Sequence, residues 1–486
     1  MSDTGPEKGT LEPLYTAAEM RAAEERYPRY PDSIPELMER AGTAVAEETL
    51  RSYPEARRLA CVCGKGSNGG DGRVAARVLR EAGREADVIE RDAAATVDLD
   101  RYDVLVDALF GTGFRGAPRP PAAALIEAMN AASAPVVAVD VPSGVDASTG
   151  EVAGPAVAAA LTVTFHAPKV GLVVEPGRTH AGRVVVADIG LEGVPTACAR
   201  ATEELVRLVG RRSAHDTKYS AGSVLVVGGQ PGMTGAAALA AMAALRADAG
   251  YVQLAVPAAA LPVVETLTLE PVKLGWTDAD AVEVITKAAA RASALAIGPG
   301  LGRGPGRQAL VRELLRRIEL PAVVDADALY GLEPVERQHP TVLTPHAGEL
   351  TRLLEAAPGW VDAHRLEAAL TAAARFGAIV LLKGRDTIVA SPPAERSAPS
   401  TAPETIVCDF GPPSLATAGT GDVLTGILSA FLTRLDAPLA AAAAAVVHGL
   451  AARAAPHQAG LVASDLLTAI PAVLGGERLG RAASSQ

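Results

Sequence analysis

The chain has 486 residues, which is too long for one ordinary core and predicts two or three domains. Its formal net charge of -11 argues against non-specific binding to nucleic acid or to an anionic membrane surface. Hydrophobic residues make up 49% and aromatic residues 3%, so Ala, Val and Leu must fill the cores, which suits helices packed on parallel strands.

The start of the chain does not resemble a targeting segment, because residues 1–7 lack both a basic region and an apolar core. The longest Ala-rich stretch, residues 439–447, is far shorter than the roughly 20 apolar residues that a membrane span requires. The four cysteines are too few for a disulfide framework, and we interpret them as buried, reduced thiols. We therefore expect a soluble, cytoplasmic protein that binds neither nucleic acid nor a membrane.

The first half of the chain alternates short β-branched runs with helical patterns. A helical segment that includes residues 20–25 and 35–49 comes first. The predicted strands are residues 59–63, 86–89, 104–109, 136–141, 161–165 and 184–188. This alternation predicts a Rossmann-like, three-layer α/β domain with a mostly parallel sheet.

A glycine-rich motif at residues 64–72 follows the first of these strands and precedes a helix predicted over residues 73–82. The motif contains G-x-G-x-x-G, and Glu90 lies at about the distance of a ribose-binding acid, so a dinucleotide-dependent oxidoreductase is one interpretation. A Rossmann helix, however, starts with small apolar residues, whereas Asn68, Asp71 and four glycines crowd this turn.

Oxygen-bearing side chains follow three of the predicted strands. Asn68, Asp107 and Ser143 all lie at the carboxyl edge of the predicted sheet, where open α/β sheets bind ligands. Together they would suit an alkali or alkaline-earth cation beside a phosphate. Taken singly, each of them, and Asp140 as well, could equally be a turn or cap residue.

The second half repeats the same style. Its predicted strands are residues 223–227, 251–256, 294–297, 322–325, 341–343, 378–382 and 387–390. We place the domain boundary near residue 210, which gives domains 1–210 and 211–486. Residues 392–403, rich in Pro, Ala and Ser, predict an exposed loop within the second domain.

The most informative motif is Gly-Thr-Gly-Asp at residues 419–422, which precedes an apolar helical run. Its backbone N–H groups at a helix N-terminus would hold an anion such as phosphate. A carboxylate beside such a site repels the anion, so Asp422 is a candidate base that takes a proton from a hydroxyl near a phosphate. The alternative is an ordinary first-turn acid stabilised by the helix dipole.

Spaced motifs in both halves carry a family resemblance. The motifs of the first half are residues 33–42, 68–72 (Asn-Gly-Gly-Asp-Gly), 107–113 (Asp-Ala-Leu-Phe-Gly-Thr-Gly), 139–144 (Val-Asp-Val-Pro-Ser-Gly) and 167–169 (Ala-Pro-Lys). Those of the second half are Lys218 and residues 222–229, 235–237, 298–302 (Gly-Pro-Gly-Leu-Gly), 344–349 (Thr-Pro-His-Ala-Gly-Glu), 383–384 and 416–426. With these motifs the first half resembles the NAD(P)HX epimerase domain of YjeF N-terminal type, and the second resembles the ribokinase-like, ADP- or ATP-dependent NAD(P)HX dehydratase.

The resemblance implies a repair enzyme for hydrated nicotinamide cofactors. Its first domain would interconvert the R and S epimers of NAD(P)HX, with Asp140 handling the proton and K⁺ bound by Asn68, Asp107 and Ser143. The implied substrate contacts of this domain are Ser67, Asn68, Gly69, Gly70, Asp71, Gly111, Thr112, Gly113, Phe114, Arg115, Gly116, Ala117 and Asp140. Ser67 stands where the family usually has a second Asn, which puts one substrate hydrogen bond in doubt.

The second domain would phosphorylate the hydroxyl of the S epimer from ADP or ATP, with Mg²⁺, so that phosphate can leave and NAD(P)H is restored. Asp422 would be the base. The implied substrate contacts are Ala236, Gly300, His346 and Asp422, and the implied nucleotide contacts are Lys383, Gly384, Arg385, Asp386, Thr387 and Gly421. Without the family context, His346 could be a surface turn residue after Pro345.

Residues 408–414 depart from the family's usual Asn- and Thr-bearing approach to the Gly-Thr-Gly-Asp loop, so the local geometry there could differ. Two other hypotheses stay open at this point. If the protein is a ribokinase-like small-molecule kinase fused to a non-catalytic scaffold, only the second half carries a catalytic site. If it is a Rossmann oxidoreductase, only the motifs of the first half are explained. We also expect a homo-oligomer of unspecified size.

Overall fold

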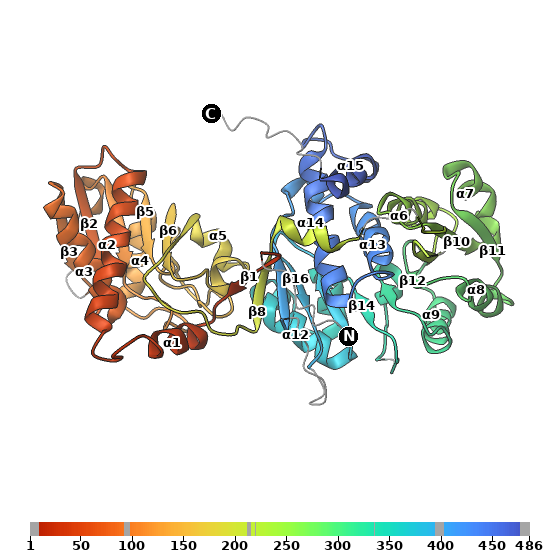
Figure 1. Cartoon of the computed structure of the whole chain (residues 1–486), viewed down its shortest axis with the longest axis horizontal. Coiled ribbons are helices and arrows are strands. Elements are labelled where there is room, and N and C mark those ends of the chain that lie inside the picture. Colours follow the sequence, from red (N-terminus) through yellow and green to blue (C-terminus); the bar gives the residue numbers. More distant parts are fainter. Residues whose placement is uncertain are drawn as a thin grey trace. The chain divides into compact units, whose positions relative to one another are not determined.

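The computed structural model describes residues 9–91, 98–210, 215–218, 220–334, 336–393 and 403–476. These residues form two compact units, each with its own sheet (Figure 1). The N-terminal unit comprises Pro13–Cys198 together with Asp362–Arg365, and the C-terminal unit comprises the remaining described residues. The chain passes between the units at Cys198 and Ala199, whereas the predicted boundary lay near residue 210.

The N-terminal unit contains all six strands predicted for the first half, each within two residues of its expected ends. Its elements are α1 (Ala17–Glu25), α2 (Ile34–Ser52), β2 (Arg58–Cys63), α3 (Ser67–Glu81), β3 (Glu85–Glu90), η2 (Leu99–Arg101), β4 (Val104–Ala108), α4 (Ala122–Ala131), β5 (Val136–Val139), β6 (Leu161–Phe165), η3 (Val170–Leu172), α5 (Gly177–Ala181) and β7 (Arg183–Ala187).

The sheet of this unit has the order β3-β2-β4-β5-β6-β7, and its strands pair in parallel. Alternate side chains of a strand point to opposite faces. Cys61 and Cys63 of β2 accordingly pack in the core shared with α2 and α3, whereas Ala60 and Val62 pack in the core shared with α4. The predicted three-layer arrangement is confirmed (Figure 1).

The C-terminal unit contains every strand predicted for the second half and further ones that were not predicted. Its elements are β1 (Leu11–Leu14), β8 (Cys198–Ala201), η4 (Glu203–Leu208), β9 (Ser223–Val227), α6 (Thr234–Arg246), β10 (Tyr251–Pro257), η5 (Ala258–Ala260), α7 (Leu261–Leu267), β11 (Val272–Trp276), α8 (Ala281–Ala289), β12 (Ala294–Ile297), α9 (Pro305–Arg317), β13 (Ala322–Val324), η6 (Ala326–Leu329), β14 (Thr341–Leu343), α10 (Ala347–Leu354), α11 (Trp360–Ala363), α12 (Arg365–Phe376), β15 (Ile379–Leu382), β16 (Thr387–Ala390), β17 (Thr405–Cys408), η7 (Pro413–Leu415), α13 (Thr420–Phe431), α14 (Ala437–Ala454) and α15 (Ala463–Gly475).

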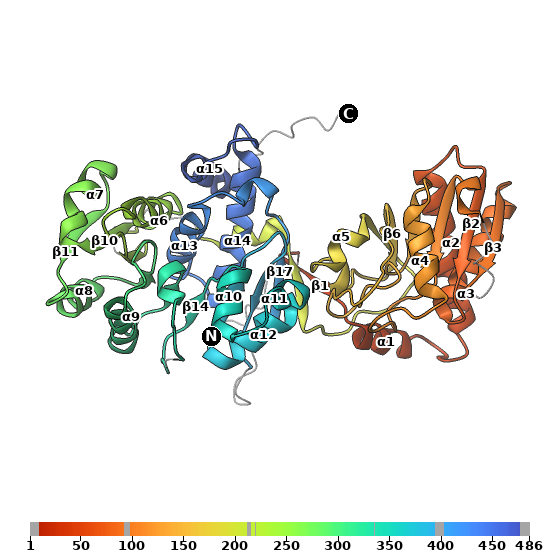
Figure 2. The same ribbon diagram turned by 180° about the vertical axis from the view of Figure 1, so that it is seen from behind.

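This sheet has eleven strands in the order β1-β8-β17-β16-β15-β14-β13-β12-β9-β10-β11. The neighbouring strands from β15 to β11 in this order, which include β9 and β10, pair in parallel, while β16 pairs antiparallel with β15 and β17. Helices α6, α13, α14 and α15 share one hydrophobic core with one face of the sheet, and α8 and α9 lie on the opposite side (Figure 2).

Helix α14 is long and apolar enough to cross a membrane by composition, but 72% of it is buried within the protein. It packs against α13 and α15 as a core helix. All four cysteines are free and buried, as predicted. Most of the loop predicted over residues 392–403 lies outside the described residues, which leave out 394–402.

Candidate functional site

The N-terminal unit has a cavity of about 1150 Å³ at the carboxyl edge of its sheet, where the loops after β2, β4 and β5 meet α1, α2 and α3. The predicted contacts that line it are Ser67, Asn68, Asp71, Gly111, Thr112, Gly113, Phe114, Arg115 and Asp140. Gly69 and Gly70 lie in the same helical turn without lining the cavity, and Gly116 and Ala117 lie beyond its lining.

Helix α3 starts at Ser67, six residues before the predicted start at Arg73, so the glycine-rich motif forms the first turn of the helix. The glycines allow the helix to approach neighbouring backbone closely. A Cβ atom at Gly69 would lie 1.9 Å from the Gly64 carbonyl oxygen, and one at Gly64 would lie 2.1 Å from that of Leu109. Larger residues here would push α3 away from the strand ends.

The carboxylate of Asp140 is held in an ion pair with a fully buried lysine. Lys169 Nζ lies 2.8 Å from Asp140 Oδ1, and Thr164 Oγ1 donates a hydrogen bond to the same oxygen at 3.1 Å. Lys169 in turn donates to Thr164 Oγ1 at 2.9 Å and to the Phe165 carbonyl at 2.7 Å. Asp140 itself has a φ of 67°, in the left-handed region that is rare for residues other than glycine. Such strain is typical of functional positions.

Three further carboxyl groups, Glu24, Glu25 and Asp71, line the same cavity, together with the basic side chains of Arg21, Lys65, Arg91 and Arg115. Burial, followed by the charges of Asp140 and Glu24, raises the pKa of Asp71 to about 8. Burial and the charge of Asp140 also raise the pKa of Glu24. The raised pKa keeps Asp71 protonated at neutral pH.

Two of the three predicted cation ligands, Asp107 and Ser143, are hydrogen-bonded to each other, and the third, Asn68, lines the cavity. Ser143 Oγ donates to Asp107 Oδ1 at 2.7 Å, and the Ser143 N–H donates to Oδ2 at 2.8 Å. Asn68 lies against Gly111, where an added Cβ would be 2.9 Å from Asn68 Oδ1. One end of the Asn68 amide is buried without a hydrogen-bond partner among the described residues.

Carboxylate, hydroxyl and amide oxygens are hard donors, and this set carries a single formal charge. The ends of an amide are assigned from their hydrogen bonds, so the orphaned end of Asn68 can present its oxygen to a cation. The set fits a weakly hydrated monovalent cation better than Mg²⁺, which prefers several carboxylates or phosphates and ideal octahedral geometry.

Glu90 does not serve as the acid of a dinucleotide fold. Arg73 Nη2 lies 2.6 Å from one Glu90 oxygen, and Arg73 Nε donates to the other at 3.1 Å. The carboxylate is thus paired with Arg73, and neither residue lines the cavity. This observation weakens the oxidoreductase interpretation of the first half.

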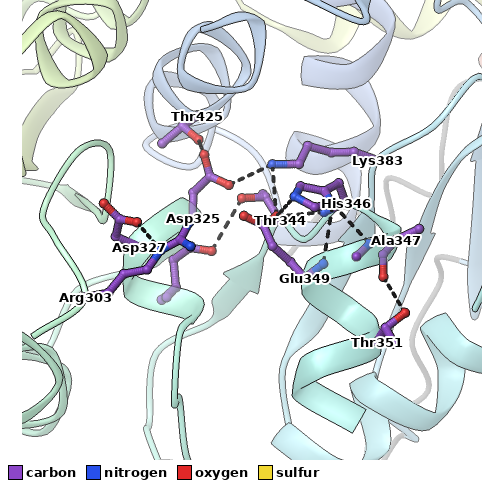
Figure 3. Close-up of polar contacts among 12 residues, drawn as sticks. Arg303, Asp325, Asp327, Thr344, His346, Ala347, Glu349, Thr351, Lys383 and Thr425 are labelled. Carbon is purple, nitrogen blue, oxygen red and sulfur yellow. Dashed lines mark hydrogen bonds and ion pairs between the residues drawn. The ribbon is translucent and has the colours of Figure 1, made fainter. Parts of the chain in front are cut away.

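In the C-terminal unit, the ends of four neighbouring strands converge on the start of α13. Asp325 follows β13, His346 follows β14, and Lys383 follows β15, while the loop of Gly300 follows β12. Figure 3 shows Lys383 between the carboxylates of Asp325 and Glu349, at distances of 2.9 and 3.8 Å. Thr425 of α13 donates to the other Asp325 oxygen at 2.6 Å and ties the helix to β13.

Asp422 occupies the first turn of α13, after the left-handed Gly419 at φ 89°. Burial, followed by the charge of Asp325, raises its pKa to about 7, although the charge of Lys383 opposes this effect. A first-turn acid stabilised only by the helix dipole would have a lowered pKa. The environment of Asp422 is therefore that of a group that exchanges a proton near neutral pH.

His346 is the N-cap of α10 and its side chain is exposed, so it has a structural role at the helix start. Its Nδ1 accepts hydrogen bonds from the N–H groups of Gly348 and Glu349 at 3.0 and 3.4 Å. Because Nδ1 is an acceptor, the ring proton resides on Nε2. Burial and the charge of Lys383 lower the pKa of His346, although Glu349 opposes this effect. A neutral imidazole with a donor at Nε2 can bind a polar substrate.

The remaining predicted residues form two groups in the C-terminal unit. An added Cβ at Gly300 would lie 3.3 Å from that of Ala236, so these two are neighbours. An added Cβ at Gly421 would lie 3.4 Å from Lys383 Nζ, which places the Gly-Thr-Gly-Asp loop beside the lysine. Gly384, Arg385, Asp386 and Thr387 form the turn between β15 and β16, where Thr387 Oγ1 donates to the Gly384 carbonyl at 2.9 Å.

Several site residues were not predicted. Lys169 and Glu349 lie within the family motifs at residues 167–169 and 344–349, and Asp325 ends the predicted strand 322–325. No role in the site was predicted from the sequence for any of the three. A second ion pair, Arg303 Nε to Asp327 Oδ1 at 2.6 Å, borders the same region (Figure 3).

Residues 408–414, the unusual segment that leads to the Gly-Thr-Gly-Asp loop, have contacts of their own. Asp409 accepts two hydrogen bonds from Arg200 of β8, at 3.1 and 2.8 Å. Ser414 Oγ donates to Gln458 at 2.9 Å. This segment is thus held to β8 and to the loop before α15.

Comparison with known proteins assigns both halves. A family model described as NAD(P)H-hydrate dehydratase matches residues 224–472, and one described as YjeF-related protein N-terminus matches residues 35–100 and 87–171. Bifunctional NAD(P)H-hydrate repair enzymes of Moorella thermoacetica and Escherichia coli are 40% and 33% identical to the chain. The alignments cover 95% and 91% of this chain and 96% and 90% of those relatives.

Solved structures resemble the C-terminal unit. The ADP/ATP-dependent NAD(P)H-hydrate dehydratase of Bacillus subtilis, co-crystallised with ATP and Mg²⁺, is 29% identical with a TM-score of 0.50 and covers 57% of this chain and 97% of that chain. A ribokinase-like superfamily protein of Enterococcus faecalis, 21% identical with a TM-score of 0.50 over 59% of this chain and 98% of that chain, shows the same fold. Two family models in order and relatives matched over nearly their full length establish that the chain belongs to the family of bifunctional NAD(P)H-hydrate repair enzymes.

Proposed function

We propose that the N-terminal unit interconverts the R and S epimers of NAD(P)HX and that the C-terminal unit dehydrates the S epimer with ADP or ATP. The observation that carries this proposal is a separate carboxylate site in each unit, at the carboxyl edge of its own sheet. Asp140 lies in the first site and Asp422 in the second. Each unit coincides with one of the two matched family models.

In the C-terminal unit, Asp422 takes the proton from the substrate hydroxyl as the hydroxyl oxygen attacks the terminal phosphorus of the nucleotide. The backbone N–H groups at the start of α13 stabilise the charge that develops on the transferred phosphoryl group. Hydroxide is a poor leaving group, whereas phosphate can depart and restore the nicotinamide double bond. Bound Mg²⁺ would neutralise the nucleotide phosphates. Ala236, Gly300 and His346 hold the substrate, and Lys383–Thr387 with Gly421 hold the nucleotide.

The test replaces Asp422 by Asn, which keeps the size of the side chain but cannot take a proton at neutral pH. With S-NADHX and ADP, the absorbance of restored NADH should appear on the order of 100-fold more slowly or worse. Asp436→Asn is the matched control, because Asp436 is also an acid at a helix start and its side chain makes no cap hydrogen bond. Turnover near the wild-type rate in Asp422→Asn would return this residue to a helix-start acid.

For the N-terminal unit we propose K⁺, held by Asn68, Asp107 and Ser143, as the ion that orders the loops and offsets substrate phosphate charge. Replacing K⁺ by tetramethylammonium should slow epimerisation while dehydration continues. Chelation of Mg²⁺ should have the reverse effect, because the nucleotide requires it. Epimerisation that is indifferent to every monovalent cation would leave these side chains as loop caps.

The proposed cellular state is a cytoplasmic homo-oligomer. Support for self-association comes from α7 and the edge strand β11, where the apolar side chains of Val263, Leu267, Leu269 and Val272 are exposed. Exposed apolar surface at a sheet edge favours pairing with another chain. Light scattering of the purified protein, with Leu269→Lys for comparison, measures the mass directly.

A further inference from the structure

The cavity of the N-terminal unit contains a second carboxyl group whose environment differs sharply from that of Asp140. Asp140 is paired with Lys169 and hydrogen-bonded by Thr164. Asp71 lines the same cavity and is only 9% exposed, yet its carboxyl group forms no hydrogen bond or ion pair with the residues that the structure describes. A nearly buried polar group that faces a cavity without a protein partner is poised to bind or react with a ligand.

The charged groups that surround Asp71 explain its state. Asp140 and Glu24 face it with negative charge, and the buried Lys169 is paired with Asp140. Glu25 and the basic side chains of Arg21, Lys65, Arg91 and Arg115 also line the cavity. Burial together with these two neighbours keeps Asp71 protonated up to a pH of about 8. A protonated carboxyl group in the same cavity as a carboxylate held in an ion pair is the arrangement that supplies an acid and a base to the same substrate.

We propose that Asp71 is a second catalytic residue of epimerisation, which gives its proton to the leaving hydroxyl of the hydrated nicotinamide, with Asp140 as the base. This inference rests on the epimerase function proposed above. As the C–O bond breaks, the lone pair of the ring nitrogen forms the C=N bond, and the departing hydroxyl takes the Asp71 proton and becomes water. Water then adds to the opposite face of the ring and loses a proton to Asp140. Asp140 then releases its proton to solvent and Asp71 takes one back, so that both groups are reset and the net reaction is epimerisation alone.

The placement of the two residues supports separate roles. Asp71 is the fifth residue of α3 and Asp140 belongs to the loop after β5, so they enter the cavity from different elements. The close approach of α3 to the strand ends, enforced by Gly64 and Gly69, fixes the position of Asp71.

The experiment compares full-length wild type with Asp71→Asn, using chromatography to follow the conversion of R-NADHX into S-NADHX without nucleotide. Asp71→Asn should lower the maximal rate about 100-fold. Wild type should lose activity as pH rises through about 8, where Asp71 ionises, and the residual activity of the variant should lack this alkaline limb. Glu81→Gln is the matched control, because Glu81 lies on the same helix, is exposed and pairs with Arg77.

The second readout is dehydration of S-NADHX by the same variant, which should equal the wild-type rate and shows that the protein is folded. An Asp71→Asn variant with the wild-type maximal rate, or one that raises only KM and keeps the alkaline limb, overturns the role of Asp71. Absence of epimerisation in the wild type would instead overturn the proposed function of the whole unit, so the two failures are distinguishable.

Discussion

The carboxyl groups of Asp71 and Asp422 share an unusual setting, because each lies near the N-terminus of a helix, Asp71 as the fifth residue of α3 and Asp422 in the first turn of α13, and each has a raised pKa. The helix dipole favours the charged form by about 0.3–1 kcal/mol, which is less than about one pKa unit. The pKa values instead rise from 3.8 to about 8 and about 7. Burial and neighbouring carboxylates therefore outweigh the dipole at both positions.

The raised pKa of Asp422 predicts a pH dependence for both activity and stability. As a base it must be ionised, so the dehydration rate should rise with pH and level off above about pH 7. For stability, the folded pKa lies above the unfolded value, so the folded state binds more protons between them. The free energy of unfolding must then fall as pH rises from about 4 to about 7.

Asp422→Asn removes this titration. Its melting temperature should exceed that of wild type at about pH 8, and the difference should shrink towards about pH 4. Calorimetry at constant ionic strength measures this, with Asp436→Asn as the reference. A difference that does not change with pH would mean that Asp422 has an ordinary pKa in the folded protein.

At the level of single residues, the sequence could identify side chains that follow strand ends or start helices, such as Asp107, Asp140 and Asp422. It could not identify their ionic partners. Asp140 pairs with Lys169 and Asp325 pairs with Lys383, 58 residues away, because the loops of neighbouring strands meet in space. Such pairs depend on strand order, which a single sequence does not contain.

Among the structural elements, buried parallel strands with β-branched runs were predicted well. Four strands were missed, and three of them have weak local signals: β1 contains Pro13, β8 reads Cys-Ala-Arg-Ala, and β11 contains Gly275 and is an edge strand. The fourth, β17, has a clear β-branched signal in Thr-Ile-Val-Cys and was overlooked. The early start of α3 was missed for a related reason. Glycine has low helix propensity, and at residues 69 and 70 it is kept for close packing and not for a turn.

Close packing between helices makes a testable prediction for α13, which carries Asp422. An added Cβ at Gly426 would lie 2.2 Å from the Ala240 carbonyl oxygen of α6. Gly426→Ala should therefore force the helices apart, cost roughly 1–3 kcal/mol in the unfolding of the C-terminal unit and reduce dehydration. Urea denaturation followed by circular dichroism measures the cost.

Gly306→Ala is the control for this effect, because Gly306 also lies in a helix but has open space where a Cβ would be. Its replacement should be neutral or stabilise by about 0.5–1 kcal/mol, since alanine reduces the entropy of the unfolded chain. Equal effects of the two substitutions would show that helix propensity, and not contact with α6, decides the outcome.

At the scale of the whole molecule, each site is complete within its own unit. The cavity around Asp140 is lined only by residues of the N-terminal unit, and the cluster around Asp422 is built only from the C-terminal unit. The two sheets also have separate strand orders. The product of the first reaction, the S epimer, must then leave the first site before the second unit acts on it, unless it is transferred directly.

This independence predicts complementation between two inactive variants. Asp140→Asn should convert S-NADHX but not R-NADHX into NADH, and Asp422→Asn should epimerise without restoring NADH. An equal mixture of the two proteins, given R-NADHX, ADP, K⁺ and Mg²⁺, should restore NADH well above the rate of spontaneous epimerisation measured with Asp140→Asn alone. The lag before NADH appears should shorten as more Asp422→Asn is added, because the S epimer passes through solution. A mixture that remains inactive, while each variant keeps its one reaction, would mean that the substrate is transferred directly within one chain.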